Sequence, residues 1–246
     1  MERLRTEEEL YAVMSVCTRM PFVYCMPETY DDTVLLYFDT DDAKEGTKRF
    51  LEQKDPIQLA KIDKKDRLAF FTGLYPMGVN AITVNYGISE GLSFQLNDLV
   101  RRQSEDKLPN GQMRIENPEL HLTALYFAQE LKKGAAGSEE TTENKEERTQ
   151  ALNGLNEELL AHFRKGTYLV AVTEDKKRPV LEKKGVSYQP IFTDVQEFQK
   201  FNREKIFQAL AVTFENIPRT LPKETDGVVI NPLGVDIVLK ITHQKE

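Results

Sequence analysis

The chain has 246 residues, 40% of them apolar and 30% charged, and Asp and Glu exceed Lys and Arg by seven (40 minus 33). That length suits one large domain or two small ones. The negative charge would repel phosphate backbones, and no apolar run approaches the ~18 residues that a membrane helix needs. Two cysteines are too few for a disulfide framework. Nucleic-acid-binding, membrane-spanning and disulfide-stapled classes are therefore excluded.

The amino terminus, MERLRTEEEL, is rich in charge where a secretory signal would be apolar, so we expect a cytoplasmic protein. In the segment that follows, Leu10, Val13, Met14 and Cys17 recur at helical spacing, and Thr6 with Glu9 fits a capping box. The pattern predicts that the first structural unit begins with a helix.

Strand-like runs come next along the chain: PFVYCM at 21–26, VLLYFDT at 34–40 and IQLAKI at 57–62. A helix with polar capping residues is expected after the second run. The segment LYPMGVNAITV at 74–84 places proline and glycine at positions that favour a tight turn. We therefore expect a closing hairpin there.

A connector separates this unit from the rest of the chain. The sequence NPELHLTALYFAQELKK aligns Leu120, Ala124, Phe127 and Leu131 on one helical stripe. The next stretch, residues 134–148, contains no large apolar side chain, which favours a flexible acidic linker. The alternative is a charged helical extension stabilised by pairs of opposite charge.

The second half repeats the order of elements. A helix is expected at 151–165, followed by strands TYLVAV at 167–172, SYQPIFT at 187–193 and FQALAVTF at 207–214. A second closing hairpin consists of GVVI, the turn Asn231-Pro232-Leu233-Gly234, and VDIVLK. That turn resembles Tyr75-Pro76-Met77-Gly78 in the first half, so the recurrence predicts one architecture in two copies.

We therefore predict an α+β protein with two tandem copies of a small mixed or antiparallel sheet module. Helices pack on one face of each sheet, and a helical connector joins the copies. The expected boundaries are 1–87 for module one, 88–150 for the connector with its linker at 134–148, and 151–246 for module two.

The runs TYLVAVTE, QPIFTDVQEF and GVVINPLGVDIVL resemble the SseB amino-terminal domain family, named for enhanced serine sensitivity, over residues 167–240. Residues 21–85 look like a degenerate second copy that keeps the proline and glycine of YPMG. The resemblance implies an α+β module of uncharacterised biochemistry, with a label sometimes tied to bacterial secretion machinery. It implies no catalytic residue.

Catalytic and metal-binding patterns are sparse. Gly87-Ile88-Ser89-Glu90-Gly91 fits the nucleophile elbow of serine hydrolases, which needs a histidine base. The run Asp39-Thr40-Asp41-Asp42, with Asp31 and Asp32 nearby, could hold Mg²⁺, although helix capping explains it better. Cys17 and Cys25 lack zinc-ligand spacing and are expected in the core. No phosphate-binding loop is present, so no cofactor and no metal site are predicted.

The favoured interpretation is a non-enzymatic protein-binding or adaptor protein, whose partner docks on an exposed strand or in a cleft between the modules. The alternative is a small hydrolase that uses Ser89. The oligomeric state is left open. The expected interaction residues are Tyr75, Pro76, Gly78, Phe192, Asn231, Pro232 and Gly234.

Overall fold

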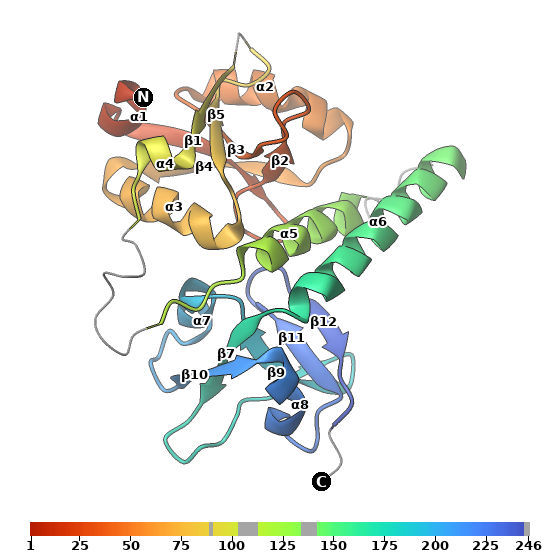
Figure 1. Cartoon of the computed structure of the whole chain (residues 1–246). Helices are drawn as coiled ribbons and strands as arrows, with labels where there is room; N and C mark the ends of the chain where they lie inside the picture. The colour runs from red at the N-terminus through yellow and green to blue at the C-terminus, as the bar shows by residue number, and fades with distance from the viewer. Residues whose placement is uncertain (89–90, 103–112, 134–141, 244–246) are drawn as a thin grey trace.

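The computed structural model describes residues 1–88, 91–102, 113–133 and 142–243 (Figure 1). It contains two six-stranded sheets, here called sheet A and sheet B. Sheet A consists of β1 (Glu9–Ser15), β2 (Val23–Cys25), β3 (Asp32–Tyr37), β4 (Ile57–Asp63), β5 (Ala81–Val84) and β6 (Leu92–Gln95). Sheet B consists of β7 (Thr167–Val172), β8 (Leu181–Lys183), β9 (Val186–Phe192), β10 (Gln208–Thr213), β11 (Gly227–Ile230) and β12 (Ile237–Lys240).

The helices connect and cover these strands. They are α1 (Glu2–Thr6), α2 (Thr40–Glu52), α3 (Arg67–Leu74), α4 (Leu96–Leu99), α5 (Pro118–Lys133), α6 (Thr142–Phe163), α7 (Val195–Phe201) and α8 (Ile217–Thr220). Short 3₁₀ turns are η1 (Lys64–Asp66), η2 (Tyr75–Met77) and η5 (Phe214–Asn216).

The two sheets have the same topology. The strand order is β4-β1-β3-β5-β6 in sheet A and β10-β7-β9-β11-β12 in sheet B, with β2 on β3 and β8 on β9. In each sheet the third and fourth strands of this order run parallel, and every other pairing is antiparallel. The predicted α+β fold with two tandem modules is confirmed.

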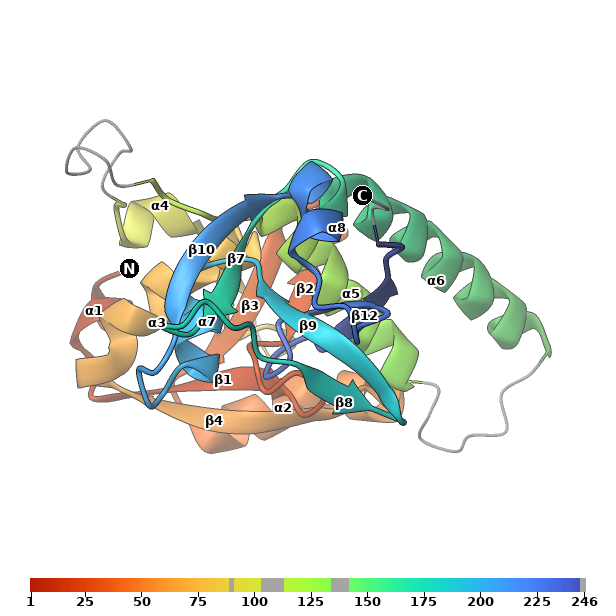
Figure 2. The same cartoon turned by 90° about the horizontal axis from the view of Figure 1, so that it is seen from below.

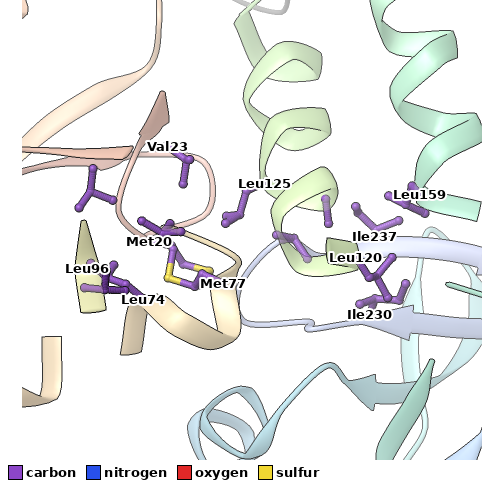
Figure 3. Packing of buried hydrophobic residues seen from close by; sticks show 14 of the residues in the cluster. Met20, Val23, Leu74, Met77, Leu96, Leu120, Leu125, Leu159, Ile230 and Ile237 are labelled. Atoms are coloured by element: carbon purple, nitrogen blue, oxygen red, sulfur yellow. The ribbon is translucent and has the colours of Figure 1, made fainter. Parts of the chain in front are cut away.

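The two modules share one hydrophobic core, and α5 lies between them (Figures 1 and 2). In Figure 3, Leu120 and Leu125 of α5 lie among side chains of both modules. The cluster includes Leu10, Val34 and Leu36 of sheet A, Leu159 and Phe163 of α6, and Ile230 and Ile237 of sheet B. The modules therefore meet in a packed interface.

Separate apolar clusters lie on the other face of each sheet. On sheet A, Val13, Leu35 and Tyr37 pack with Ala43 and Phe50 of α2. On sheet B, Leu169, Ala171 and Phe192 pack with Phe198 of α7. Each sheet thus buries both faces.

Hydrogen bonds tie α5 to both modules. At its start, Asn117 Nδ2 donates to the carbonyls of Thr167 and Thr193, both at 2.8 Å. Nearer its end, the amide of Gln129 donates to Val23 O at 2.9 Å and accepts from Val23 N at 3.1 Å. Buried polar pairs of this kind fix one geometry, because an alternative packing would leave the groups unpaired.

The predicted helix through Leu10, Val13, Met14 and Cys17 is wrong, because α1 ends at Thr6 and Glu9–Ser15 forms β1. This strand is central, paired on one side with β3 and on the other with β4. Leu10 and Ala12 join the shared core, whereas Val13 faces α2. A strand buried on both faces loses its alternating pattern, so its apolar residues mimicked helical spacing.

The connector also differs from expectation. Helix α6 begins at Thr142, so residues 142–148 adopt the helical alternative to the predicted flexible linker; residues 134–141 lie outside the described residues. The first turns of α6 project beyond the two sheets (Figure 2). Strand β6 pairs with β5, so sheet A extends past the boundary predicted at residue 87.

The proposed equivalence of the two turns is wrong. Tyr75–Met77 forms η2, ahead of β5, whereas Asn231-Pro232-Leu233-Gly234 follows β11 and connects it to β12. The topological partner of Asn231 is Asn85. Asn231 N donates to Ile191 O on β9, and Asn85 N donates to Leu36 O on β3, each at 2.9 Å. Both asparagines adopt positive φ, 46° and 55°. The likeness of the two halves therefore lies in the topology, not in the tetrapeptide.

Candidate functional site

Two sequence motifs of module two meet in the structure. Thr193 N donates to Asn231 Oδ1 at 2.9 Å, and Asn231 Nδ2 donates to Thr193 Oγ1 at 2.7 Å. Both residues are fully buried. The reciprocal pair joins the end of β9 to the turn after β11 and holds Asn231 in its left-handed conformation, which asparagine adopts more readily than most residues.

Asp194 extends this contact to α5 and α7. Its Oδ1 caps α7 by accepting from Gln196 N at 2.8 Å and Glu197 N at 3.0 Å. Its Oδ2 accepts from Thr193 Oγ1 at 2.8 Å and lies 3.3 Å from Nδ1 of His121, a buried residue of α5. Burial alone raises the pKa of Asp194, but His121, the Glu197 N–H and Thr193 together hold that pKa below its usual value.

These contacts are structural in character. Phe192, Asn231 and Gly234 are buried, as is Pro76 in module one, so none of the four presents a surface. Of the turn after β11, Leu233 is the exposed member, at 52%. Of the expected interaction residues of module two, Phe192, Asn231 and Gly234 therefore lie beneath the surface, whereas Pro232 is half-buried.

The expected interaction residues of module one lie elsewhere. Tyr75 and Gly78 line a shallow groove of about 370 Å³ next to Pro118 and Leu122 of α5. Gly78 has a φ of 81°, and a Cβ there would lie 2.6 Å from Pro118 O. Tyr75 Oη donates to Val100 O at 2.6 Å. The YPMG segment thus seats the start of α5 against module one.

Ser89 lies outside the described residues. The strands on either side of it, β5 and β6, pair antiparallel, so the segment joins two strands of a hairpin. A nucleophile elbow joins a strand to a helix. The three histidines are engaged elsewhere: His121 with Asp194, His162 with Glu158 at 3.3 Å, and His243 with Thr225 O at 2.6 Å.

The acidic run in module one caps a helix. Asp39 Oδ1 accepts from Asp41 N at 2.7 Å and Asp42 N at 3.2 Å, at the start of α2. Asp31 accepts instead from Asn80 and Gln95. Among the described residues, no three His, Cys, Asp or Glu side chains are placed to hold a metal ion.

The cysteines are less buried than predicted. Cys17 is half-buried and Cys25 is exposed, so the expectation that both lie in the core is wrong. Partial burial raises the pKa of both thiols, and Asp32 and Asp31 raise that of Cys25 further. A raised pKa makes a thiol a poor nucleophile near neutral pH.

The edge of sheet B exposes backbone groups that can form hydrogen bonds with a partner. Strand β10 forms one edge of sheet B, opposite the edge formed by β12, and pairs with β7 alone (Figure 1). Five of its six residues, Gln208–Ala211 and Thr213, are exposed, and none of the six is charged. Leu210 exposes 42% of its surface. A long, uncharged edge strand is a ready template for another strand, and proteins usually protect such edges.

The register shows which backbone groups are free. Phe214 N donates to Gly166 O, one pair beyond Thr213 and Thr167, so even-numbered residues of β10 direct their N–H and C=O groups to β7. The N–H and C=O groups of Ala209 and Ala211, and the N–H of Thr213, therefore point outward. Within the described part of the chain they have no hydrogen-bond partner.

Asn202 limits this free stretch at one end. Its side chain donates to Phe207 O at 2.8 Å and accepts from Phe207 N at 3.0 Å. The amide thereby takes the place that a neighbouring strand would occupy at Phe207. At the other end the chain turns into η5 after Thr213. The free part of the edge is thus centred on Ala211.

The equivalent edge of sheet A is different. Strand β4 pairs with β1, and Lys64 N donates to Glu8 O, which makes Leu59, Lys61 and Asp63 the outward residues. They are the topological counterparts of Ala209, Ala211 and Thr213. Lys61 Nζ lies 2.8 Å from Glu9 and 3.0 Å from Asp63. Charges on an edge strand oppose the addition of another strand.

Comparison with known proteins identifies the second module. Residues 146–241 match the family described as "SseB protein N-terminal domain". The resemblance predicted over 167–240 is confirmed: module two matches the SseB N-terminal domain family. That module one is a degenerate copy of the same family stays a prediction. No curated protein sequence matches the chain.

Among solved structures, the chain is similar to "Tic22 from Plasmodium falciparum" at 11% identity, over 92% of this chain and 89% of that one, with a TM-score of 0.22. It is also similar to "Anabaena Tic22 (protein transport)" at 8% identity, over 94% of this chain and 92% of that one, with the same TM-score of 0.22. A TM-score at this level carries no argument about fold or function. Within the described ranges, no helix has the length and apolar character to cross a bilayer.

Proposed function

We propose that this chain is a non-enzymatic protein-binding protein, and that a partner adds a strand to the outer edge of β10. The observation that carries the proposal is the open, uncharged edge centred on Ala211, set against the charged edge of β4. In strand addition, main-chain hydrogen bonds supply affinity, and side-chain contacts supply selectivity.

The packed interface between the modules supports the same choice. A partner was expected either on an exposed strand or in a cleft between the modules. The shared core and α5 fill the space between the sheets, which favours the strand edge over an inter-module cleft as the docking surface.

The test uses a library of seven-residue peptides selected on the immobilised full-length chain. Ala211→Pro removes an outward N–H without breaking the ladder to β7, because the Ala211 N–H points away from that strand. We expect selected peptides to bind Ala211→Pro at least about tenfold more weakly, since it lacks a backbone donor and the ring obstructs approach.

Lys61→Pro is the matched control. It makes the same change at the counterpart position of β4, and peptide binding should be unchanged. Peptides that bind wild type and Ala211→Pro with equal affinity would show that β10 is not the docking edge.

The hydrolase alternative is tested separately. Turnover of activated esters by the wild type and by Ser89→Ala should be the same if the chain is not a serine hydrolase. A loss of turnover in Ser89→Ala would favour the alternative.

A further inference from the structure

The free backbone groups of β10 are centred on Ala211, so that a second β10 strand could pair with them across a two-fold axis. Its outward residues are Ala209, Ala211 and Thr213, and Asn202 closes the edge at Phe207. An antiparallel copy of the same strand, related by a two-fold axis through Ala211, would place Ala209 opposite Thr213 and Ala211 opposite itself. The Ala211 N–H of each copy would then face the Ala211 carbonyl of the other, and each Thr213 N–H would face an Ala209 carbonyl.

We propose that the strand added to β10 is β10 of a second copy of this chain, so that the two B sheets join into one continuous sheet around Ala211. This inference rests on the proposed function and names its partner. The interface is isologous: the same surface is used on both copies.

Side chains on the inner face favour this register. Leu210 pairs with Val170 on β7, and Val170 and Val212 belong to the shared core. In the two-fold arrangement Leu210 of one copy lies directly opposite Val212 of the other. The exposed part of Leu210 gains an apolar neighbour on the core side of the joined sheet.

Charge is compatible with self-pairing. The strand has no charge that would repel its own copy. Before β10 the exposed residues Arg203, Glu204 and Lys205 carry one net positive charge, and exposed Glu215 follows β10. The antiparallel arrangement places the end of β10 that follows Arg203–Lys205 beside the end that precedes Glu215 in the second copy.

Mass is the first measurement. Light scattering on the full-length chain, over a range of concentrations, should show a monomer that converts to a dimer. Both copies donate an Ala211 N–H across the axis, so Ala211→Pro removes two hydrogen bonds at once and should raise the dimer dissociation constant at least about tenfold. Lys61→Pro should dimerise like the wild type.

A covalent trap tests the register. In a Cys17→Ser, Cys25→Ser background, Ala211→Cys should form an intermolecular disulfide under mild oxidation, because hydrogen-bonded antiparallel pairs have Cα atoms ~5.5 Å apart. Gln208→Cys is the control: it lies opposite Phe214 of the other copy, far from its own counterpart, and should stay uncrosslinked.

The outcomes separate this inference from the proposed function. A chain that stays monomeric, or a dimer that Ala211→Pro leaves intact, overturns the two-fold pairing. If library peptides still lose affinity for Ala211→Pro, strand addition stands and the partner is another protein. If neither dimer nor peptide binding depends on Ala211, both proposals fail.

Discussion

The two modules share a topology, yet they treat equivalent positions differently. At the sheet edge, module one places Lys61 and Asp63 where module two has Ala211 and Thr213. At the end of the central parallel pair, Asn85 has a buried Oδ1 without a partner, whereas Asn231 makes reciprocal hydrogen bonds with Thr193. Two modules with the same topology can thus differ in their edge strands: charges on β4 oppose the addition of another strand, whereas the uncharged β10 leaves backbone groups free.

The largest expected effect comes from the paired asparagines. Asn231→Ala would leave Thr193 N without its acceptor and force alanine into positive φ, so we expect about 3 kcal/mol of lost stability. Asn85→Ala, whose side-chain oxygen has no partner to lose, should cost about 1 kcal/mol. Urea unfolding of both variants measures the difference, and equal losses would contradict the structural role assigned to Asn231.

The helix caps give the next contrast. Asp194→Ala removes the cap of α7 and also the buried neighbour of His121, which together should cost about 2–3 kcal/mol. Asp39→Ala removes only an exposed cap of α2 and should cost about 1 kcal/mol. Denaturant midpoints at neutral pH compare the two. A larger loss for Asp39→Ala would show that burial of the cap is unimportant.

Lowering the pH should reduce the stability that the Asp194 carboxylate contributes. Because the pKa of Asp194 in the folded chain lies below its ordinary value of 3.8, its ionisation contributes stability above that value, and the contribution is lost as pH falls through the folded pKa. The stability gap between wild type and Asp194→Ala should therefore narrow as pH falls from 6 toward 3. Urea titrations across that range test this, and a gap that widens would reverse the assigned sign.

Exchanging the edges tests the comparison directly. Ala211→Lys with Thr213→Asp gives β10 the charges of β4 and should weaken association about tenfold, because a strand would have to desolvate them. The two positions are exposed, so the fold should tolerate the change. Light scattering and circular dichroism report the two effects. An unchanged dimer would mean that edge charge does not govern association.

The reciprocal exchange should have the smallest effect. Lys61→Ala with Asp63→Thr removes the charges of β4 and should produce weak additional association, visible only at high concentration. Sedimentation velocity over a concentration series detects it. A variant that stays like the wild type throughout would show that β4 is protected by more than its charges.

Part of this structure was predictable from the sequence. The hairpin around Asn231-Pro232-Leu233-Gly234 combines turn residues with flanking apolar strands, and it forms as expected. The six other strands named at 21–26, 34–40, 57–62, 167–172, 187–193 and 207–214 also form, because their apolar residues cluster between polar boundaries.

The remaining features depend on tertiary structure. Strand β1 is buried on both faces, which removed the alternation that marks a strand. The equivalence of Asn85 and Asn231 could not be predicted from the local sequence, because proline follows Asn231 but not Asn85. The YPMG segment resembles the Asn231 turn in sequence but forms η2 instead. His121 joins Asp194 across 73 positions (194 minus 121), a contact that no local pattern discloses.

The edge of β10 shows the same limit. The sequence FQALAVTF predicts a strand, but a strand at the edge and a strand in the middle read alike when the residues are small and apolar. Which backbone groups remain free follows from the pairing with β7 and from the side chain of Asn202. Neither the pairing nor the Asn202 contact can be deduced from the local sequence.

The shared core has a practical consequence for anyone who expresses part of this chain. A fragment cut to the family boundaries, residues 146–241, would keep Ile230, Ile237, Leu159 and Phe163 but lose Leu120, Ala124 and Leu125 of α5. Without α5, the fragment would expose an apolar face to solvent, and we expect it to aggregate. Recombinant work on this region should therefore retain the full chain, because residues of module one cover the other side of the same core.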